Sequence, residues 1–311
     1  MQYEHKKINI AFFGSSEFSI PTLQYLIEDT EVNISALITL PPAQKNRGKK
    51  LSNNIVYDFA IQNNIPKENI MTPSKLRNNN EIISILQSYN IDFIVVVAYG
   101  KIIPQEIIKL PKYEILNLHP SALPAYRGAA PIERAIENGE TQLDICIMKV
   151  NAGLDTGDVY VRLPYTINNS QSAKEIIPDI ADKGGELMIT TIKNIINGKI
   201  ECHPQNSHGT TYANKIDKSE LFIDLQNKNL DAEKTYNKIR AFNNCGCCYF
   251  LLNNTRIKIL SCEIQRINNN IIGFNKSDGC LYLRNGIIKP LIIQKEGKKP
   301  VTLKDFLNGL K

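Results

Sequence analysis

The sequence lacks the features of a membrane protein and of a secreted protein. Its longest apolar stretch, Ile91 to Ile103, contains Asp92 and Lys101 and is well short of the roughly 20 residues that a membrane-spanning helix needs. The N-terminus is polar, and its first apolar run, Ile8 to Phe13, is too short for the core of a signal peptide. We therefore expect a protein of the cytosol.

The number and the spacing of the cysteines do not indicate a disulfide framework or a zinc site. The seven cysteines are an odd number in a chain of 311 residues, which argues against a small secreted fold. Cys245 and Cys248 form a CxxC pair, but Cys262 and Cys280 are too far apart to supply the second pair of a zinc site. We expect reduced cysteines and no metal.

Tryptophan is absent and histidine is scarce. Histidine is the side chain best suited to move protons near neutral pH, so few residues are candidates for this role. Of the four histidines, His5 lies in the N-terminal tail, and His203 and His208 lie in a polar segment. Only His119 falls at the end of a regular apolar pattern. It is therefore the main candidate for an acid–base group.

Positive charge is unevenly distributed. The net charge is +6, and from Asn206 onward Lys and Arg outnumber Asp and Glu by 17 to 9. A basic C-terminal part on a near-neutral body favours an anionic partner, of which nucleic acid is the commonest. A lysine-rich solvated surface would give the same composition, so charge alone leaves both interpretations open.

The length suffices for two domains, and the first part alternates apolar strands with helical patterns. This alternation predicts an α/β fold: a Rossmann-like domain with a parallel sheet, in which ligands bind beyond the carboxyl ends of the strands. The expected strands are residues 8–13, 34–40, 93–98, 114–119 and 143–150.

A second, smaller domain is expected after a linker. The helical stretch 173–197, opened by the capping box Ser172-x-x-Glu175, closes a first domain of residues 1–197. Residues 198–211 are polar and are predicted to be a linker. Several short strand patterns in residues 212–311 predict a small, OB-like β-barrel domain.

Asn117 and His119 lie two residues apart at the end of a predicted strand, so their side chains share one face. An Asn amide can donate to a developing oxyanion, and a His can donate to the same oxygen or move a proton. Together they form half of an acyl-transfer site. A single His at a strand end is more often structural, so the pair needs a carboxylate to support it.

A carboxylate is available after the strand 143–150. The glycine-bounded loop 151–158 lies at the carboxyl end of its strand, as His119 does, so Asp155 or Asp158 could orient the imidazole. The same residues would also suit an ordinary Asp-Thr-Gly turn. The sequence leaves the choice open.

Longer motifs surround Asn117, His119 and Asp155. Asn117-x-His119-Pro-Ser-Ala-Leu-Pro124, followed by Leu154-Asp-Thr-Gly157, resembles the signature of the folate-dependent formyltransferases. The stretches Arg127-Gly-Ala-Ala-Pro-Ile132 and Val95-Val-Val-Ala-Tyr-Gly100 extend the resemblance. With Arg240-Ala-Phe-Asn243 in the second domain, it covers nearly the whole chain.

The resemblance implies roles for these positions. Asn117, His119 and Asp155 match the catalytic trio of the family, whose formyl donor is 10-formyltetrahydrofolate. The segment from Tyr99 to Ile103 matches the one whose backbone faces the pterin. No metal is implied. The folate-binding loop corresponds to Ser121, Ala122, Leu123 and Pro124.

The resemblance is greatest to family members that formylate methionyl initiator tRNA. It implies that Arg47, Lys49 and Lys50, in a loop after the second strand, reach the acceptor end of the tRNA. The basic barrel would bind the tRNA backbone by charge. A monomer is our default expectation.

Two segments depart from the family pattern. The loop 41–46 lacks the usual acidic and basic residues before Arg47, and Asn244 to Cys248 replaces the usual prolines and tryptophan. Both departures leave the trio intact.

Three other functions share some of these features. A formyltransferase acting on a small amine, such as a ribotide or an amino sugar nucleotide, would share the trio without needing a basic barrel. A nicotinamide-dependent oxidoreductase is disfavoured because the turn after Phe13 lacks the second and third glycines of GxGxxG. A non-catalytic RNA-binding protein would not require the trio.

Overall fold

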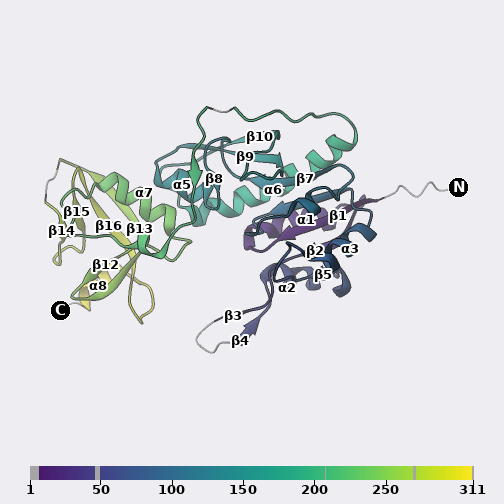
Figure 1. Ribbon diagram of the computed structural model, residues 1–311. Helices are drawn as coiled ribbons and strands as arrows, with labels where there is room; N and C mark the ends of the chain where they lie inside the picture. The colour runs from purple at the N-terminus through teal and green to yellow at the C-terminus, as the bar shows by residue number, and fades with distance from the viewer. Residues whose placement is uncertain (1–6, 46–49, 207, 269–270, 310–311) are drawn as a thin grey trace. The chain divides into compact units, whose positions relative to one another are not determined.

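The computed structural model describes residues 7–45, 50–206, 208–268 and 271–309 (Figure 1). Contacts within the chain define two compact units. Unit 1 comprises residues 1–129, 144–165 and 177–212, and unit 2 comprises residues 130–143, 166–176 and 213–311. The sequence predicts one continuous domain on each side of a linker at residues 198–211, whereas each unit defined by contacts is built from three separate segments. The domain boundaries expected from the sequence therefore stay a prediction.

A seven-stranded sheet with the order β10-β9-β7-β6-β1-β2-β5 forms the centre of unit 1. The pairs β1–β2, β1–β6, β2–β5 and β6–β7 are parallel, which confirms the predicted α/β class. Its strands are β1 (Ile8–Gly14), β2 (Val32–Ile38), β5 (Ile70–Met71), β6 (Phe93–Val97), β7 (Glu114–His119), β9 (Gln142–Lys149) and β10 (Val159–Thr166).

The central strands are apolar because both faces of this sheet are covered. All five residues of β6 are buried, as are the last five of β1. The Ser19 hydroxyl donates to the carbonyl of Val97 at 2.6 Å, so the ends of these two strands are held together. This brings the turn after β1 beside the loop after β6.

One expectation about the sheet is wrong. Strand β9 runs antiparallel to β7, with Leu116 opposite Lys149 and His119 opposite Cys146. The carboxyl end of β9 therefore lies at the opposite edge of the sheet from His119. Between β7 and β9 the chain passes through α5 (Pro131–Glu137), which belongs to unit 2, whereas a parallel pair needs a crossover helix packed on its own sheet.

Helices and short strands complete unit 1. The helix α6 packs against β7 so closely that a Cβ on Gly184 would lie 2.6 Å from Leu118. Asn54 and Asn79 cap α2 and α3 by accepting from backbone amides. The elements are η1 (Glu17–Ser19), α1 (Ile20–Glu28), β3 (Ala43–Lys45), β4 (Lys50–Ser52), α2 (Ile55–Gln62), η2 (Lys67–Asn69), α3 (Asn80–Ser88), α4 (Gln105–Ile108), β8 (Arg127–Gly128), α6 (Ala173–Ile196) and β11 (Tyr212–Ala213).

Unit 2 contains an antiparallel half-barrel sheet, as the sequence predicted. Its order is β12-β13-β16-β15-β14, with β17 added beside β16. Thr302 caps the last helix by accepting from the Asp305 amide. The elements are α5 (Pro131–Glu137), η3 (Lys218–Leu221), α7 (Ala232–Phe242), β12 (Tyr249–Leu252), β13 (Thr255–Arg266), β14 (Gly273–Phe274), β15 (Leu281–Leu283), β16 (Gly286–Lys295), β17 (Val301–Thr302) and α8 (Leu303–Asn308).

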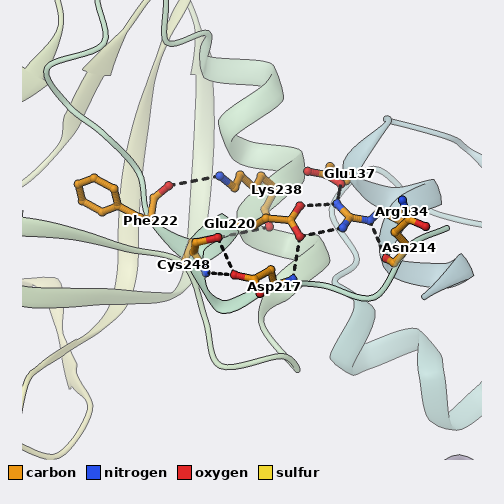
Figure 2. A network of polar contacts seen from close by, with 9 residues as sticks. Arg134, Glu137, Asn214, Asp217, Glu220, Phe222, Lys238 and Cys248 are labelled. Carbon is orange, nitrogen blue, oxygen red and sulfur yellow. Dashed lines mark hydrogen bonds and ion pairs between the residues drawn. The ribbon is translucent and has the colours of Figure 1, made fainter. Parts of the chain in front are cut away.

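Polar side chains hold α5 within unit 2. Arg134 donates to both carboxylate oxygens of Glu220, to Glu137 and to the carbonyl of Asn214 (Figure 2). Such a bidentate Arg–carboxylate pair fixes the relative orientation of the two side chains. The pKa of the Glu220 carboxyl lies below its usual value because Arg134 donates to it.

The buried Arg240 on α7 also contacts segments from earlier in the chain. Its guanidinium donates to the carbonyls of Gln171 at 3.0 Å and Ile136 at 3.5 Å, and to the Asn237 side chain. Only 5% of its surface is exposed, and burial lowers the pKa of the guanidinium. The hydrogen-bond acceptors of this buried guanidinium are thus two backbone carbonyls and an amide oxygen, all of them uncharged.

No helix in the part of the chain that the structure describes is long and apolar enough to cross a membrane.

Candidate active site

Strand β7 places Asn117 and His119 at its carboxyl end, as predicted. Asn117 pairs through its backbone with Val96 on β6 and Met148 on β9. Its side chain is half-buried, whereas His119 is 4% exposed. A buried imidazole and an accessible amide thus share one strand end.

Both ring nitrogens of His119 face oxygen atoms. Nε2 lies 3.0 Å from the carbonyl oxygen of Tyr126, and Nδ1 lies 3.7 Å from Oδ2 of Asp155. Either neutral tautomer can donate to only one of these acceptors, while the protonated ring can donate toward both. The Tyr126 carbonyl fixes the ring orientation and leaves Nδ1 toward Asp155.

Asp155 reaches His119 although β9 ends at the other edge of the sheet. The loop after β9 folds back, and Asp155 takes a left-handed backbone conformation with φ of 50°. Its Oδ2 accepts from the backbone amide of Gly128 at 2.8 Å. The reason given from the sequence, a shared carboxyl edge, was wrong, but the side chain lies at the expected place.

The second candidate carboxylate lies elsewhere. Oδ2 of Asp158 is 3.8 Å from the thiol of Cys202, and its carbonyl accepts from the amide of Lys149. The geometry therefore separates two aspartates that the sequence left as alternatives.

The loop Ser121 to Pro124 is held by its own neighbours and by strands β9 and β10. The Ser121 hydroxyl donates to the carbonyl of Ala125, and the buried Cys146 thiol donates to the carbonyl of Ser121 at 3.1 Å. Arg162 donates to the carbonyl of Leu123 at 2.7 Å. Burial raises the pKa of the Cys146 thiol to about 12, so this cysteine serves as an uncharged donor.

The loop after β6 is fixed by Ser15 in the turn after β1. The Ser15 hydroxyl lies within 2.9 Å of the carbonyls of both Ala98 and Tyr99. Tyr99 is buried edge-on against Phe13, and burial raises the pKa of its phenol to about 12. The sequence singled out Tyr99 but gave no role to Ser15, because a Gly-Ser-Ser turn has no distinctive chemistry.

The predicted tRNA-contacting residues are only partly covered. Arg47 and Lys49 lie outside the described residues, and of Lys50 only the backbone in β4 is described. β3 and β4 pair antiparallel. The prediction for these three residues stays a prediction.

All seven cysteines are free. Among residues 7–45, 50–206, 208–268 and 271–309, no group of three or more His, Cys, Asp or Glu side chains could hold a metal ion. Burial raises the pKa of Cys248 and Cys262 to about 12 each.

The polar segment predicted as a linker contributes contacts that the sequence did not indicate. Gln205 donates to the carbonyls of Asp155 and Gly157 and accepts from Arg127. The Thr211 hydroxyl accepts from the amide of Tyr126. Neither residue belongs to a periodic pattern, so only its place in space reveals it.

A parallel-sheet unit with an Asn-x-His strand end and a carboxylate behind the imidazole defines a class of group-transfer enzymes. The sequence profile for "Formyl transferase" matches residues 6–192, and that for "Formyl transferase, C-terminal domain" matches residues 215–311. The chain belongs to the formyl transferase family. The reaction class is formyl transfer, and folate derivatives are the formyl carriers of this family.

Within the family, the chain resembles methionyl-tRNA formyltransferases over its whole length. The enzyme of that name from Sulfurihydrogenibium sp. is 35% identical, with 98% of this chain and 97% of the relative covered. Methionyl-tRNA formyltransferase from Clostridium thermocellum has a similar fold, with a TM-score of 0.57, 19% identity, and 83% and 94% of the two chains covered.

An N-formyltransferase solved with a nucleotide-linked sugar also shares the fold. The N-formyltransferase from Helicobacter canadensis, solved with folinic acid and dTDP-3-aminofucose, superimposes with a TM-score of 0.65 at 19% identity. The match covers 91% of this chain and 99% of that one. At this identity the likeness concerns the fold alone.

Proposed function

We propose that the protein transfers the formyl group of 10-formyltetrahydrofolate to the α-amine of methionyl initiator tRNA. The observation that carries the proposal is the placement of Asn117, His119 and Asp155 together, in a chain aligned end to end with methionyl-tRNA formyltransferases. The product is the formylmethionyl-tRNA that begins translation.

The reaction requires stabilisation of an alkoxide. The amine nitrogen attacks the formyl carbon, a new C–N bond forms, and the carbonyl oxygen takes the negative charge of a tetrahedral intermediate. The half-buried Asn117 amide at the strand end supplies an uncharged donor for that oxygen, and protonated His119 adds a positive charge beside it. Collapse breaks the bond to the folate nitrogen.

Proton movement falls to the pair His119 and Asp155. The attacking amine loses a proton, and the departing folate nitrogen gains one. The Asp155 carboxylate lies 3.7 Å from Nδ1, and we assign to this pair the uptake and relay of the amine proton. The bond from Gly128 to Asp155 keeps the carboxylate directed at the ring.

Folate binding is assigned to two loops. Ser121, Ala122, Leu123 and Pro124 form the loop against the co-substrate, and the backbone from Tyr99 to Ile103 faces the pterin. The loops are rigidly anchored, by Arg162 and Cys146 in the first case and by Ser15 in the second. A fixed backbone suits recognition by main-chain groups.

The tRNA would be bound by charge. From Asn206 onward the chain has 17 Lys and Arg residues and 9 Asp and Glu residues, and this excess of positive charge supports a polyanionic partner. Arg47, Lys49 and Lys50 would reach the acceptor end. A monomer acting in the cytosol without a metal completes the proposal.

One experiment tests this function directly. Purified protein is mixed with 10-formyltetrahydrofolate and methionyl-tRNA, and formylmethionyl-tRNA is measured after hydrolysis of the ester. A parallel reaction offers a nucleotide-linked amino sugar. Formylation of the tRNA amine is expected. Formylation of the sugar amine alone would assign the chain to the small-amine branch and refute the proposal.

A further inference from the structure

We infer that Gln205 is a positioning residue that holds the Asp155 loop against Arg127 and thereby directs the Asp155 carboxylate at His119. The inference rests on the proposed function for its kinetic test. Gln205 comes from the polar segment that follows α6, about 50 residues after Asp155, and all the contacts involved lie within unit 1.

Every hydrogen-bonding position of the Gln205 amide is used. Its Oε1 accepts from Nε of Arg127 at 3.1 Å and from Nη2 at 2.7 Å. Its Nε2 donates to the carbonyl of Asp155 at 2.8 Å and to that of Gly157 at 2.7 Å. A primary amide offers two acceptor lone pairs and two hydrogens, so the group is saturated.

The surroundings also fix which end of the amide is which. A flipped amide would direct its NH2 group at a guanidinium, which only donates, and its oxygen at two carbonyls, which only accept. The site therefore requires a side chain that accepts on one side and donates on the other. Glutamine meets this requirement, while glutamate and methionine of nearly the same length do not.

The loop needs such support because its backbone is strained. Asp155 has a φ of 50°, a region that residues with a Cβ adopt at an energetic cost. The two bonds from Gln205 hold the carbonyls on either side of Thr156, while Gly128 holds the carboxylate at 2.8 Å. Since Arg127 and Gly128 are adjacent, two parallel connections join β8 to the loop.

The consequence for catalysis follows from distance. Nδ1 of His119 and Oδ2 of Asp155 are 3.7 Å apart, so a small displacement of the loop would remove much of their interaction. A misplacement of about 1 Å at a catalytic group can reduce the rate about 100-fold. The contacts of the Gln205 amide are to Arg127 and to the backbone of the Asp155 loop, so we assign it an effect through Asp155.

The test compares two substitutions. Gln205→Met removes all four bonds, whereas Gln205→Glu keeps the acceptor for Arg127 and places an oxygen against the two carbonyls. Both should lower kcat about 10- to 100-fold, with KM for either substrate changed less than about threefold. Restoration of kcat by Gln205→Glu would show that only Arg127 needs the contact and would overturn the inference.

Two further measurements separate positioning from general instability. In an Asp155→Asn background, Gln205→Met should lower kcat by less than about threefold, because the two residues act as one. Fully multiplicative losses would overturn the inference. Gln62→Met and Gln62→Glu, on the exposed end of α2, are matched controls that should leave kcat unchanged.

Hydrogen exchange tests the loop without any substrate. Residues 151–158 should exchange faster in both Gln205 variants, while α6 and the Gln62 controls keep wild-type rates. This result stands even if the wild-type protein fails to formylate methionyl-tRNA, in which case the proposed function alone is refuted. Wild-type exchange of this loop, or wild-type kcat in both Gln205 variants, would overturn the inference.

Discussion

His119 is the residue whose environment determines most about the site. A buried imidazole between a backbone carbonyl and a carboxylate is held in one orientation. Asn117, two residues earlier on the same strand, is half-buried. The pair divides the work: one side chain donates without charge, and the other can carry a proton.

Replacing either residue with alanine should therefore reduce turnover strongly. Loss of one oxyanion donor typically lowers the rate about 100- to 1000-fold, and we expect Asn117→Ala and His119→Ala to fall in this range. Single-turnover formylation of methionyl-tRNA measures the effect. His203→Ala is the matched control, because His203 is exposed and contacts Val159 through its backbone. Near-normal rates in correctly folded Asn117 or His119 variants would contradict the assigned roles.

The sequence could indicate some site residues and not others. Asn117 and His119 were predictable because two-residue spacing on a strand fixes their relation. Asp155 was placed correctly for a wrong reason, since β9 is antiparallel to β7 and the loop folds back. Gln205 and Ser15 gave no signal, because their contacts join segments that periodicity cannot relate.

Two consecutive glycines allow α6 to pack closely, one against β7 and the other against α1. A Cβ on Gly184 would lie 2.6 Å from Leu118, and one on Gly185 would lie 2.7 Å from the Tyr25 ring. Alanine normally favours a helix over glycine by about 1 kcal/mol, so the packing must outweigh propensity at these positions. The glycines allow α6 to approach both β7 and α1.

We expect Gly184→Ala to destabilise the protein by roughly 1–3 kcal/mol through overpacking, despite the gain in helix propensity. Chemical denaturation of the variant measures the free energy of unfolding. Glu186→Ala, on the exposed face of the same helix, is the control and should change it little. A stabilised Gly184→Ala protein would mean that Leu118 can move aside at no cost.

Arg134 and Glu220 connect α5 to η3 in unit 2, and the pair should make stability depend on pH. The folded-state pKa of Glu220 is lowered, first by the hydrogen bond from Arg134. Its stabilising contribution is therefore complete above the unfolded-state pKa of about 4.3 and is lost as pH falls through the lower folded value.

Thermal unfolding of wild type and Glu220→Gln tests this dependence. At pH 7 the substitution should lower the free energy of unfolding by roughly 1 kcal/mol, a modest value because the pair is partly exposed. The difference should shrink below about pH 4. Glu233→Gln is the control, since its pair with Arg266 is more exposed. A difference that stays constant from pH 7 to pH 3 would refute the attribution to charge.

The basic character of the C-terminal part predicts how the two substrates respond to salt. Raising salt from about 50 to 200 mM should weaken methionyl-tRNA binding at least about tenfold, because lysines and arginines release counterions from the phosphates. Folate affinity should change little. Filter binding for tRNA and fluorescence titration for folate measure both quantities. A tRNA complex insensitive to salt would count against binding by charge.

The make-up of unit 2 also predicts the behaviour of fragments. Residues 212–311 alone would lack the carbonyls of Ile136 and Gln171, to which the buried Arg240 donates. Each lost partner of a buried polar group costs about 1–3 kcal/mol. We expect this fragment to unfold without a cooperative transition, as measured by circular dichroism. A sharp transition would support the boundaries predicted from the sequence.

Most of the fold was predictable because strong periodicity identifies single elements. The bounds expected for the strand 114–119 agree with β7, and those of the helix 173–197 differ from α6 by one residue. The direction of β9 and the membership of α5 in unit 2 depend on contacts between distant segments. The hydrophobic pattern within one segment carries no information about the direction in which a strand pairs or about the unit to which a helix belongs.

The membership of α5 in unit 2 has a consequence for synthesis on the ribosome. α5 ends at Glu137, and its packing partner α7 begins at Ala232, about 95 residues later. At elongation rates of roughly 5–20 residues per second, the nascent chain presents α5 for roughly 5–20 s before α7 emerges. Its apolar residues Ile132 and Ile136, buried in the finished protein, are open to chaperones throughout that interval.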